Sequence, residues 1–209
     1  MLDLWADQLG KGLARMRISA SREQQQLLLN YLALLEKWNR AFNLTAVRDP
    51  VKMVSRQLLD SLSIQHLLEG DRVLDVGSGA GLPGIPLSIL NPERDFVLLD
   101  TNSKKTRFLR QARLELPLEN VEIEQARVEK YRPSQGFDLI TSRAFASLPD
   151  MLGLTRHLLA PGGGWLAMKG AVPVAELETL GDEYSVEVHQ LDVPEEPGQR
   201  HGILIRPAM

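Results

Sequence analysis

The chain has 209 residues, of which 44% are hydrophobic, and it carries a formal net charge of −3 at pH 7 and no cysteine. This composition is that of an ordinary globular protein able to bury a full core, and the absence of cysteine excludes disulfides, thiolate metal sites and thiol nucleophiles. A net charge this close to neutral argues against a generally basic nucleic-acid binder, although a local basic face is compatible with it.

Nothing in the sequence predicts a targeting, membrane or metal-binding segment. No apolar run reaches the roughly 18 residues of a membrane span. Residues 1–14 contain acids and no cleavage-site pattern, which argues against a signal peptide. The four histidines are scattered without metal-ligand spacing, so we expect no metal. The lack of cysteine fits a reducing compartment, and we expect a cytoplasmic protein.

The N-terminal third is predicted to be helical. Between Ser21 and Phe42, leucines and aromatic residues recur at three- and four-residue steps, and Ser21 with Gln24 has the pattern of a capping box. A second helix is predicted from about Val51 to Leu68, where a glycine follows.

From Arg72 onward, short apolar strands alternate with helical patterns, which predicts a mostly parallel sheet covered on both faces. The five strands predicted first are Arg72–Val76, Asp95–Asp100, Val121–Ala126, Phe137–Ser142 and Trp165–Lys169. Two more, Tyr184–Val193 and His201–Arg206, are separated only by a turn-rich segment, which predicts an antiparallel hairpin at one edge. We expect residues 1–70 to form a helical extension packed on a domain of residues 71–209, effectively one globular unit.

The first predicted strand runs into VLDVGSGAGLPGIPL, residues 73–87, with four glycines and two prolines. Open α/β sheets bind ligands beyond the carboxyl ends of their strands, and glycines there let the backbone approach a ligand closely. The spacing Gly79-x-Gly81-x-x-Gly84 matches the dinucleotide fingerprint, but it begins too far past the strand. The alternative register, Asp75-x-Gly77-x-Gly79-x-Gly81, resembles the first motif of class I S-adenosylmethionine-dependent methyltransferases.

Two further features bear on the choice between a dinucleotide and S-adenosylmethionine as the ligand. Asp100 ends the second predicted strand, where a carboxylate can accept the two ribose hydroxyls of either ligand. The antiparallel final hairpin is typical of the methyltransferase sheet. We therefore predict a class I S-adenosylmethionine-dependent methyltransferase (Rossmann-like) α/β fold. Its mostly parallel seven-stranded sheet has an antiparallel last strand and an N-terminal helical extension, and its cofactor is S-adenosyl-L-methionine.

The type of methyl acceptor is narrowed by what the chain lacks. Transfer to pyrimidine C5 needs a cysteine that adds to the ring, and there is none. The reactive box that amine methyltransferases commonly carry after the fourth strand is replaced here by Ser142-Arg143-Ala144-Phe145. A ring nitrogen such as guanine N7 needs neither device, because its lone pair is already free and catalysis can rest on proximity and alignment.

Six segments in order resemble one known family. They are KWNRAFNLTAVRDP, RQLLDSL, DVGSGAGLPGIPLSIL, LLDTNSKKTRFLRQ, FDLITSRAFASL and MKG. The family is the bacterial small-subunit rRNA (guanine-N7) methyltransferase G, also called glucose-inhibited division protein B. The resemblance implies methylation of N7 of guanosine 527, in the 530 loop of 16S rRNA, within the small ribosomal subunit or its precursor, by a protein that we expect to be a monomer. The alternative is a catalytically silent RNA-binding or ribosome-assembly factor on the same fold. One position departs from the family, because Gln57 stands where a histidine is common.

The resemblance and the glycine motif together nominate the site residues. The candidate cofactor-binding residues are Gly77, Gly79, Leu82, Asp100, Val128, Glu129 and Arg143. Arg143 is also the candidate catalytic residue: its fixed charge suits the cofactor carboxylate or guanine O6, and it cannot act as a base at neutral pH.

Basic residues around the same cleft are candidates for RNA contacts. Arg107, Arg110 and Arg113 are predicted to share one solvent face of the helix after Asp100. This arrangement fits either a solvated surface or a surface that binds RNA phosphates. Lys104, Lys105 and Lys169 would add to the rim of the cleft.

Overall fold

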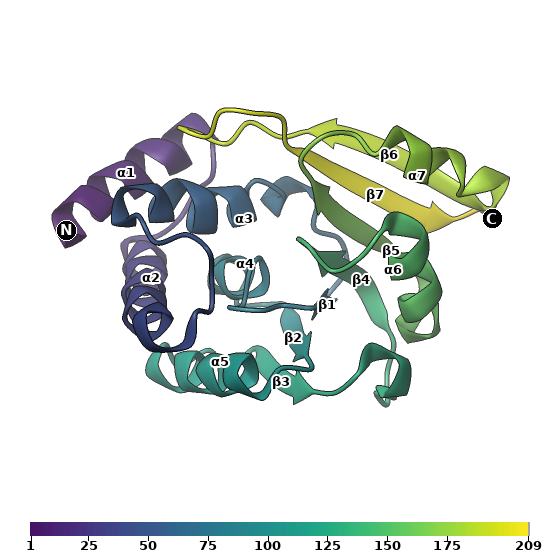
Figure 1. Ribbon diagram of the computed structural model, residues 1–209, viewed down its shortest axis with the longest axis horizontal. Coiled ribbons are helices and arrows are strands. Elements are labelled where there is room, and N and C mark those ends of the chain that lie inside the picture. The colour runs from purple at the N-terminus through teal and green to yellow at the C-terminus, as the bar shows by residue number, and fades with distance from the viewer. Residues whose placement is uncertain (209) are drawn as a thin grey trace.

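The computed structural model describes residues 1–208, and its centre is a seven-stranded sheet in the order β3-β2-β1-β4-β5-β7-β6 (Figure 1). The strands are β1 Arg72–Val76, β2 Asp95–Asp100, β3 Val121–Gln125, β4 Phe137–Ser142, β5 Leu159–Lys169, β6 Tyr184–Gln190 and β7 His201–Pro207. The first five strands pair in parallel. β7 runs antiparallel to β5 on one side and to β6 on the other. The predicted parallel sheet with an antiparallel hairpin at its edge is therefore confirmed.

Alternating side chains along the strands divide the interior into two hydrophobic cores, as the period of a β-strand requires. One face of the sheet presents Val73, Phe96, Leu98, Leu139 and Leu166 to the N-terminal helices and to the helices that follow the first two strands, α4 (Gly84–Leu90) and α5 (Ser103–Glu115). The opposite face presents Leu74, Val97, Ile140, Trp165 and Ile203 to α6 (Leu148–Thr155) and the turns beside it. The two layers are visible on either side of the sheet in Figure 1.

The helices on the first face begin with two at the N-terminus, α1 Leu2–Arg15 and α2 Arg22–Phe42. The sequence analysis did not predict α1, although its buried Trp5, Leu9 and Leu13 follow four-residue steps. α2 begins where predicted, and its capping box is complete: the Ser21 hydroxyl accepts from the Gln24 amide and the Gln24 side chain accepts from the Ser21 amide.

The helix predicted from about Val51 to Leu68 is present over most of that range, but it is irregular and interrupted after Leu62. The segment is a 3₁₀ turn at Pro50–Lys52, a π-helical turn at Val54–Leu59, a short α3 at Asp60–Leu62 and a 3₁₀ turn at Gln65–Leu67. Its buried side chains include polar ones, and two of their hydroxyls bond to the helix backbone: Ser61 Oγ donates to the Gln57 carbonyl at 2.7 Å and Ser63 Oγ to the Asp60 carbonyl at 2.6 Å. Such local bonds compete with the regular helical ladder.

The remaining helices connect the strands of the sheet. They are α4 Gly84–Leu90, α5 Ser103–Glu115, α6 Leu148–Thr155 and α7 Val174–Glu178, with 3₁₀ turns at Val128–Lys130, Arg156–Leu158 and Gly181–Glu183. Across residues 1–208, no helix combines the length and apolar character that crossing a lipid bilayer demands.

Candidate cofactor and substrate site

A pocket of about 230 Å³ opens beyond the carboxyl ends of β1, β2 and β4. Its lining residues are Val76, Gly77, Leu99, Asp100, Thr101, Lys105, Ala126, Val128, Ala144 and Phe145. Three of the predicted cofactor-binding residues, Gly77, Asp100 and Val128, thus lie around one cavity, and Lys105 lies there with them. This is the edge at which open α/β sheets bind ligands.

The Asp100 carboxylate is fixed by the backbone on both sides. Its Oδ2 accepts from the Gly79 amide at 2.9 Å, and its Oδ1 accepts from the Asn102 amide at 2.8 Å. Because a carboxylate offers about four lone-pair sites, each oxygen retains the capacity to accept from a ligand hydroxyl. The same group therefore shapes the glycine loop and presents acceptors to the pocket.

Gly77, Gly79 and Gly81 of the loop all have left-handed φ angles, and the last two have different surroundings. At Gly79, with φ +59°, an added Cβ would have no neighbouring atom closer than 3.8 Å, and one of the two atoms at that distance is the Lys105 ammonium nitrogen. At Gly81, with φ +89°, an added Cβ would lie 2.5 Å from the Ile85 side chain and 2.8 Å from Leu109. An added Cβ thus makes only ordinary contacts at Gly79, whereas at Gly81 it would collide with the core.

Asp75 lies beneath this loop and is almost completely buried. Its Oδ2 accepts from the Gly84 amide at the start of α4 at 3.0 Å, while its Oδ1 has no hydrogen-bond partner within residues 1–208. Burial raises the pKa of Asp75 to about 7, against the opposing effects of the Gly84 amide and Arg143. The carboxyl group therefore holds a proton well into the range where an exposed aspartate is ionised.

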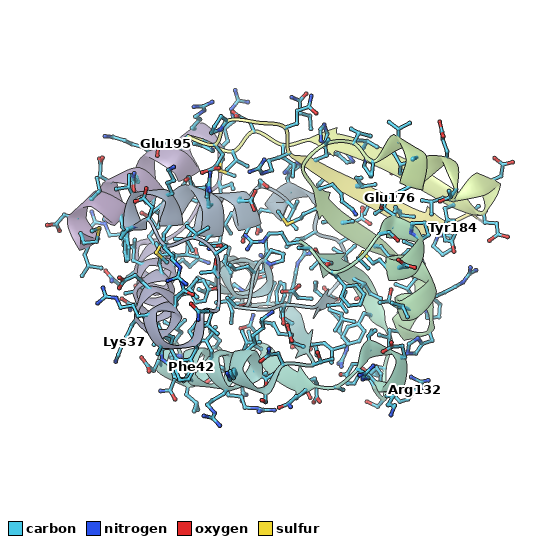
Figure 2. All side chains as sticks on the ribbon, viewed as in Figure 1. Lys37, Phe42, Arg132, Glu176, Tyr184 and Glu195 are labelled. Carbon is cyan, nitrogen blue, oxygen red and sulfur yellow. The ribbon has the colours of Figure 1, made fainter. Side chains whose placement is uncertain are left out.

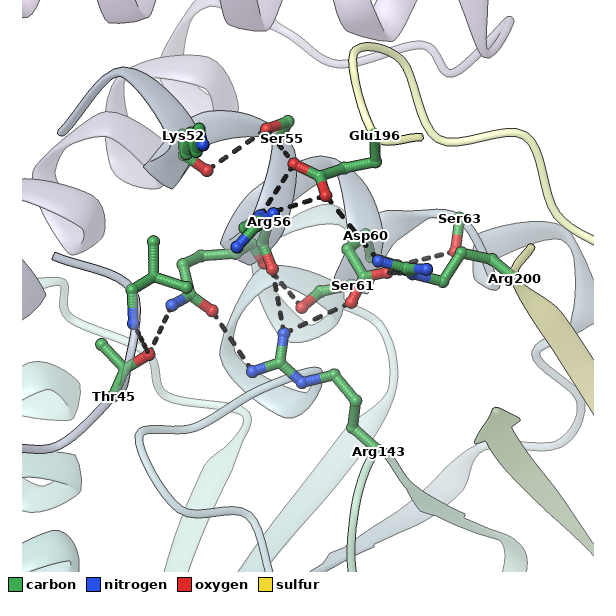
Figure 3. A network of polar contacts seen from close by, with 12 residues as sticks. Thr45, Lys52, Ser55, Arg56, Asp60, Ser61, Ser63, Arg143, Glu196 and Arg200 are labelled. Carbon is green, nitrogen blue, oxygen red and sulfur yellow. Dashed lines mark hydrogen bonds and ion pairs between the residues drawn. The ribbon is translucent and has the colours of Figure 1, made fainter. Parts of the chain in front are cut away.

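Arg143 lies outside the first pocket and points from the end of β4 toward the irregular helical segment (Figure 3). Its Nη1 donates to the Arg56 carbonyl at 3.1 Å and to Asp60 Oδ2 at 3.3 Å, and its Nη2 donates to Gln57 Oε1 at 3.2 Å. Asp60 also accepts at Oδ1 from Arg200 Nε at 3.2 Å, so one carboxylate lies between two guanidinium groups.

These cations surround a second cavity of about 150 Å³. Its lining residues are Asp60, Arg143, Met168, Lys169, Gly170, Leu191, Arg200 and His201. The Lys169 ammonium is 3.2 Å from Glu176 Oε2, and Glu176, labelled in Figure 2, also accepts from the Leu148 amide at the start of α6. The cavity therefore combines three cationic side chains with one carboxylate in its wall.

The other predicted site residues lie apart from the two cavities. Leu82 is buried in the core beneath the glycine loop, and Glu129 is exposed next to Val128. Lys104, Arg107, Arg110 and Arg113 are exposed on α5, and within the described chain they form no ion pair shorter than 4.0 Å.

The sequence analysis did not nominate Asp60 or Arg200. Asp60 is an acid among the three leucines of the segment 56–62, and such an acid must find a partner when it is buried. That signal could have been read from RQLLDSL. No comparable signal marks Arg200, because it comes to the site only through the antiparallel return of β7 beside β5.

The sheet order, the antiparallel β7 and the ligand pocket above β1 and β2 define a class I S-adenosylmethionine-dependent methyltransferase fold. The O-methyltransferase TomG from Streptomyces achromogenes, solved in complex with S-adenosylmethionine, has the same fold, with a TM-score of 0.57 and 16% identity over 86% of this chain and 90% of that one. Aeropyrum pernix fibrillarin, solved with bound S-adenosyl-L-methionine, matches with a TM-score of 0.55 and 18% identity over 73% of this chain and 75% of that one.

Sequence relatives identify the family within this class. The family model described as rRNA small subunit methyltransferase G matches residues 24–203. The ribosomal RNA small subunit methyltransferase G of Stutzerimonas stutzeri is 54% identical over 204 residues, which cover 96% of this chain and 95% of that protein. The chain belongs to the rRNA small subunit methyltransferase G family, and the predictions of family and fold are confirmed.

The pocket fits the cofactor of this fold. Asp100 provides carboxylate lone pairs for hydroxyl groups, and the half-buried Ala126 and buried Val128 provide an apolar wall for a flat ring. The glycine loop brings backbone, and not side chains, to the opposite wall at Gly77. S-adenosylmethionine is therefore the cofactor that the fold and the donor set both support.

Proposed function

We propose that this chain methylates N7 of guanosine 527 in the 530 loop of 16S rRNA, acting as a monomer on the small ribosomal subunit or its precursor in the cytoplasm. The single observation that carries the proposal, beyond family membership, is the adjacency of the two cavities. Ala144 and Phe145 line the first, and the preceding residue, Arg143, lines the second. A cofactor held over Asp100 and an anionic nucleic acid held near Arg143 would meet at this loop.

The proposed cofactor site uses the residues nominated from the sequence. Asp100 accepts hydrogen bonds from the ribose hydroxyls, and the backbone at Gly77 and Gly79 runs close beside the methionine moiety. Leu82 supports the loop from the core. Val128 packs on the adenine and Glu129 accepts from its edge. When bound, S-adenosylmethionine supplies a methyl group activated by a positively charged sulfur.

Arg143 is the proposed catalytic residue and acts without exchanging a proton. Three of the five N–H donors of its guanidinium bond to the irregular helical segment, so two are left for a ligand. Guanine O6 or the cofactor carboxylate would suit these donors, whereas donation to N7 would occupy the lone pair that must attack. The free lone pair needs no base, so the chain has to supply only alignment and a fixed positive charge.

The proposed RNA contacts are electrostatic. Lys104, Arg107, Arg110 and Arg113 leave their charges exposed on α5, and Lys105 and Lys169 extend the positive surface toward the two cavities. Cations arranged in this way contact phosphates and give affinity that falls with salt.

The test uses small ribosomal subunits, and separately free 16S rRNA, from cells that lack this chain. Each is incubated with the purified protein and methyl-labelled S-adenosylmethionine, and the methylated nucleosides are mapped by mass spectrometry. The expected product is one 7-methylguanosine at position 527 of the 530 loop. Methylation of a different base would refute the proposed target. Cofactor binding without any methylation of either substrate would favour the silent assembly factor.

A further inference from the structure

Gln57 is a fully buried amide that joins Arg143 to a neighbouring loop. Its Nε2 donates to Thr45 Oγ1 at 2.7 Å, and its Oε1 accepts from Arg143 Nη2 at 3.2 Å. It lies within the π-helical turn Val54–Leu59, and such turns are frequent at functional sites. Figure 3 shows Thr45 and Arg143 joined by a chain of dashed contacts.

The orientation of the amide is determined by its surroundings. Thr45 Oγ1 accepts from the Val47 amide at 3.2 Å and from the Gln57 nitrogen at 2.7 Å, which uses both of its lone pairs. The Gln57 oxygen then has to face Arg143, which can only donate. A neutral group with one donor and one acceptor end satisfies both neighbours.

We propose that Gln57 is a positioning residue that holds the Arg143 guanidinium in its working orientation through this neutral amide. The inference rests on the proposed role of Arg143 in methyl transfer. Residues 56, 57 and 60 of the helical segment provide the three acceptors for Arg143, but only Gln57 provides a neutral side chain. The amide thus fixes the geometry of the guanidinium without reducing its charge.

The requirement for neutrality follows from the charges around Gln57. The charged and titratable groups of this network are Arg56, Asp60, Arg143, Glu196 and Arg200, with Asp75 and Tyr31 close enough to interact with Arg143. A cation at position 57 would face Arg143 directly and could not accept from it. A neutral imidazole can still donate with one nitrogen and accept with the other.

Two variants test the proposal by activity. Gln57→Met keeps the length of the side chain and removes both hydrogen bonds, so we expect the kcat on small ribosomal subunits to fall at least about tenfold, with little change in cofactor affinity. Gln57→His should keep activity while the imidazole is neutral. Its activity relative to the unmodified protein should fall between pH 8 and pH 5.5 in proportion to the neutral fraction, read from the NMR titration of that histidine.

The matched control is Gln65→His, which places a histidine in the same helical segment. The Gln65 amide donates to Asn91 Oδ1 at 2.9 Å and makes no contact with Arg143 among the described residues. Its activity relative to the unmodified protein should be independent of pH. An unchanged kcat in Gln57→Met, or the same pH dependence in both histidine variants, would overturn the proposal.

A readout independent of activity separates this inference from the proposed function. The guanidinium ¹⁵N–¹H signals of Arg143, assigned with an Arg143→Lys variant, should be slow to exchange in the unmodified protein and broadened in Gln57→Met, with the melting temperature retained. Loss of this ordering with no detectable methylation by any form would refute the function and leave the positioning role supported. Unchanged Arg143 signals would refute the positioning role.

Discussion

The Tyr31 hydroxyl donates a 2.7 Å hydrogen bond to the carbonyl of Ala80, so the second N-terminal helix contacts the backbone of the glycine loop directly. Tyr31 is completely buried, and this burial raises its pKa, which keeps the hydroxyl protonated and able to donate. We therefore propose that the helical extension of residues 1–70 and the domain of residues 71–209 act as one globular unit, with α2 supporting the cofactor loop.

Replacing Tyr31 by phenylalanine should weaken the loop. The change leaves a buried carbonyl without its donor, which costs about 1–3 kcal/mol of unfolding free energy, and it should also lower the affinity for S-adenosylmethionine. Urea unfolding and calorimetric titration measure the two effects. The control is Tyr184→Phe, whose hydroxyl accepts only from the exposed Arg156 at 3.1 Å, and which should change neither quantity. Equal behaviour of the two variants would contradict the supporting role of Tyr31.

The two glycines of the loop should respond differently to substitution. Gly79→Val adds a branched side chain at a left-handed φ, next to the amide that bonds to Asp100, so we expect cofactor binding to be lost at a stability cost of about 1–3 kcal/mol. Gly81→Ala forces a Cβ against Ile85 and Leu109, so its main effect should be on unfolding. Gly153→Ala, in α6 with no atom within 4 Å of the added Cβ, is the control that should affect neither. Normal cofactor affinity in Gly79→Val would refute the assignment of this loop.

The strands could be predicted from the sequence because each is a short apolar run ended by turn residues. β1, β2 and β4 have the predicted boundaries. The irregular form of the helical segment after Pro50 could not be predicted, because its leucine spacing fits a regular helix. Side chains of its π-helical turn bond to Glu196 and Arg143, which come from distant parts of the chain.

The site was predictable only as far as its motifs are local. Gly77 and Asp100 each follow or end a strand, and parallel strands bring those ends to one edge. The partners of Arg143 were not predictable, because pairing with Asp60 requires the helical segment to lie over β4.

The arginines of α5 should account for a measurable part of RNA affinity. Replacing Arg107, Arg110 and Arg113 with glutamine removes three exposed cations, so the salt dependence of binding to 16S rRNA should flatten by up to about three counterions. Cofactor affinity should not change. The matched control replaces the exposed Lys11 of α1, Arg17 of the following turn and Arg22 at the start of α2, and should leave the slope as it is. Indistinguishable slopes for the two triple variants would show that the α5 face is only solvated surface.

The buried carboxyl of Asp75 should make stability depend on pH. Its folded pKa of about 7 exceeds the ordinary unfolded value of about 3.9, so the folded state holds a proton that the unfolded state releases. This contribution is complete below about pH 4 and is lost as pH rises through about 7, a change on the order of 4 kcal/mol. The unfolding free energies of the cofactor-free protein at pH 5 and pH 8 should therefore differ less in Asp75→Asn than in the unmodified protein. Asp182→Asn, at an exposed position, should retain the difference.

Arg143 provides the most direct test of the proposed reaction. Arg143→Ala removes the positive charge and the planar guanidinium group. The loss of one charge-assisted hydrogen bond corresponds to about 1.5–3 kcal/mol, or roughly one to two decades in rate. We expect methylation of small ribosomal subunits to fall by at least this much. The fold should persist, because Asp60 keeps its ion pair with Arg200 at 3.2 Å.

Arg143→Lys separates the charge of this residue from its shape. Lysine keeps the positive charge but cannot donate in a fixed fork to the Arg56 carbonyl, Gln57 and Asp60 together, so we expect poor rescue of the rate. Arg132→Ala, at the exposed position labelled in Figure 2, should leave the rate unchanged. The measurement is the initial rate of 7-methylguanosine formation, with melting temperatures recorded for every variant. A normal rate in Arg143→Ala would show that this arginine only neutralises Asp60, and that the catalytic centre lies elsewhere around the first pocket.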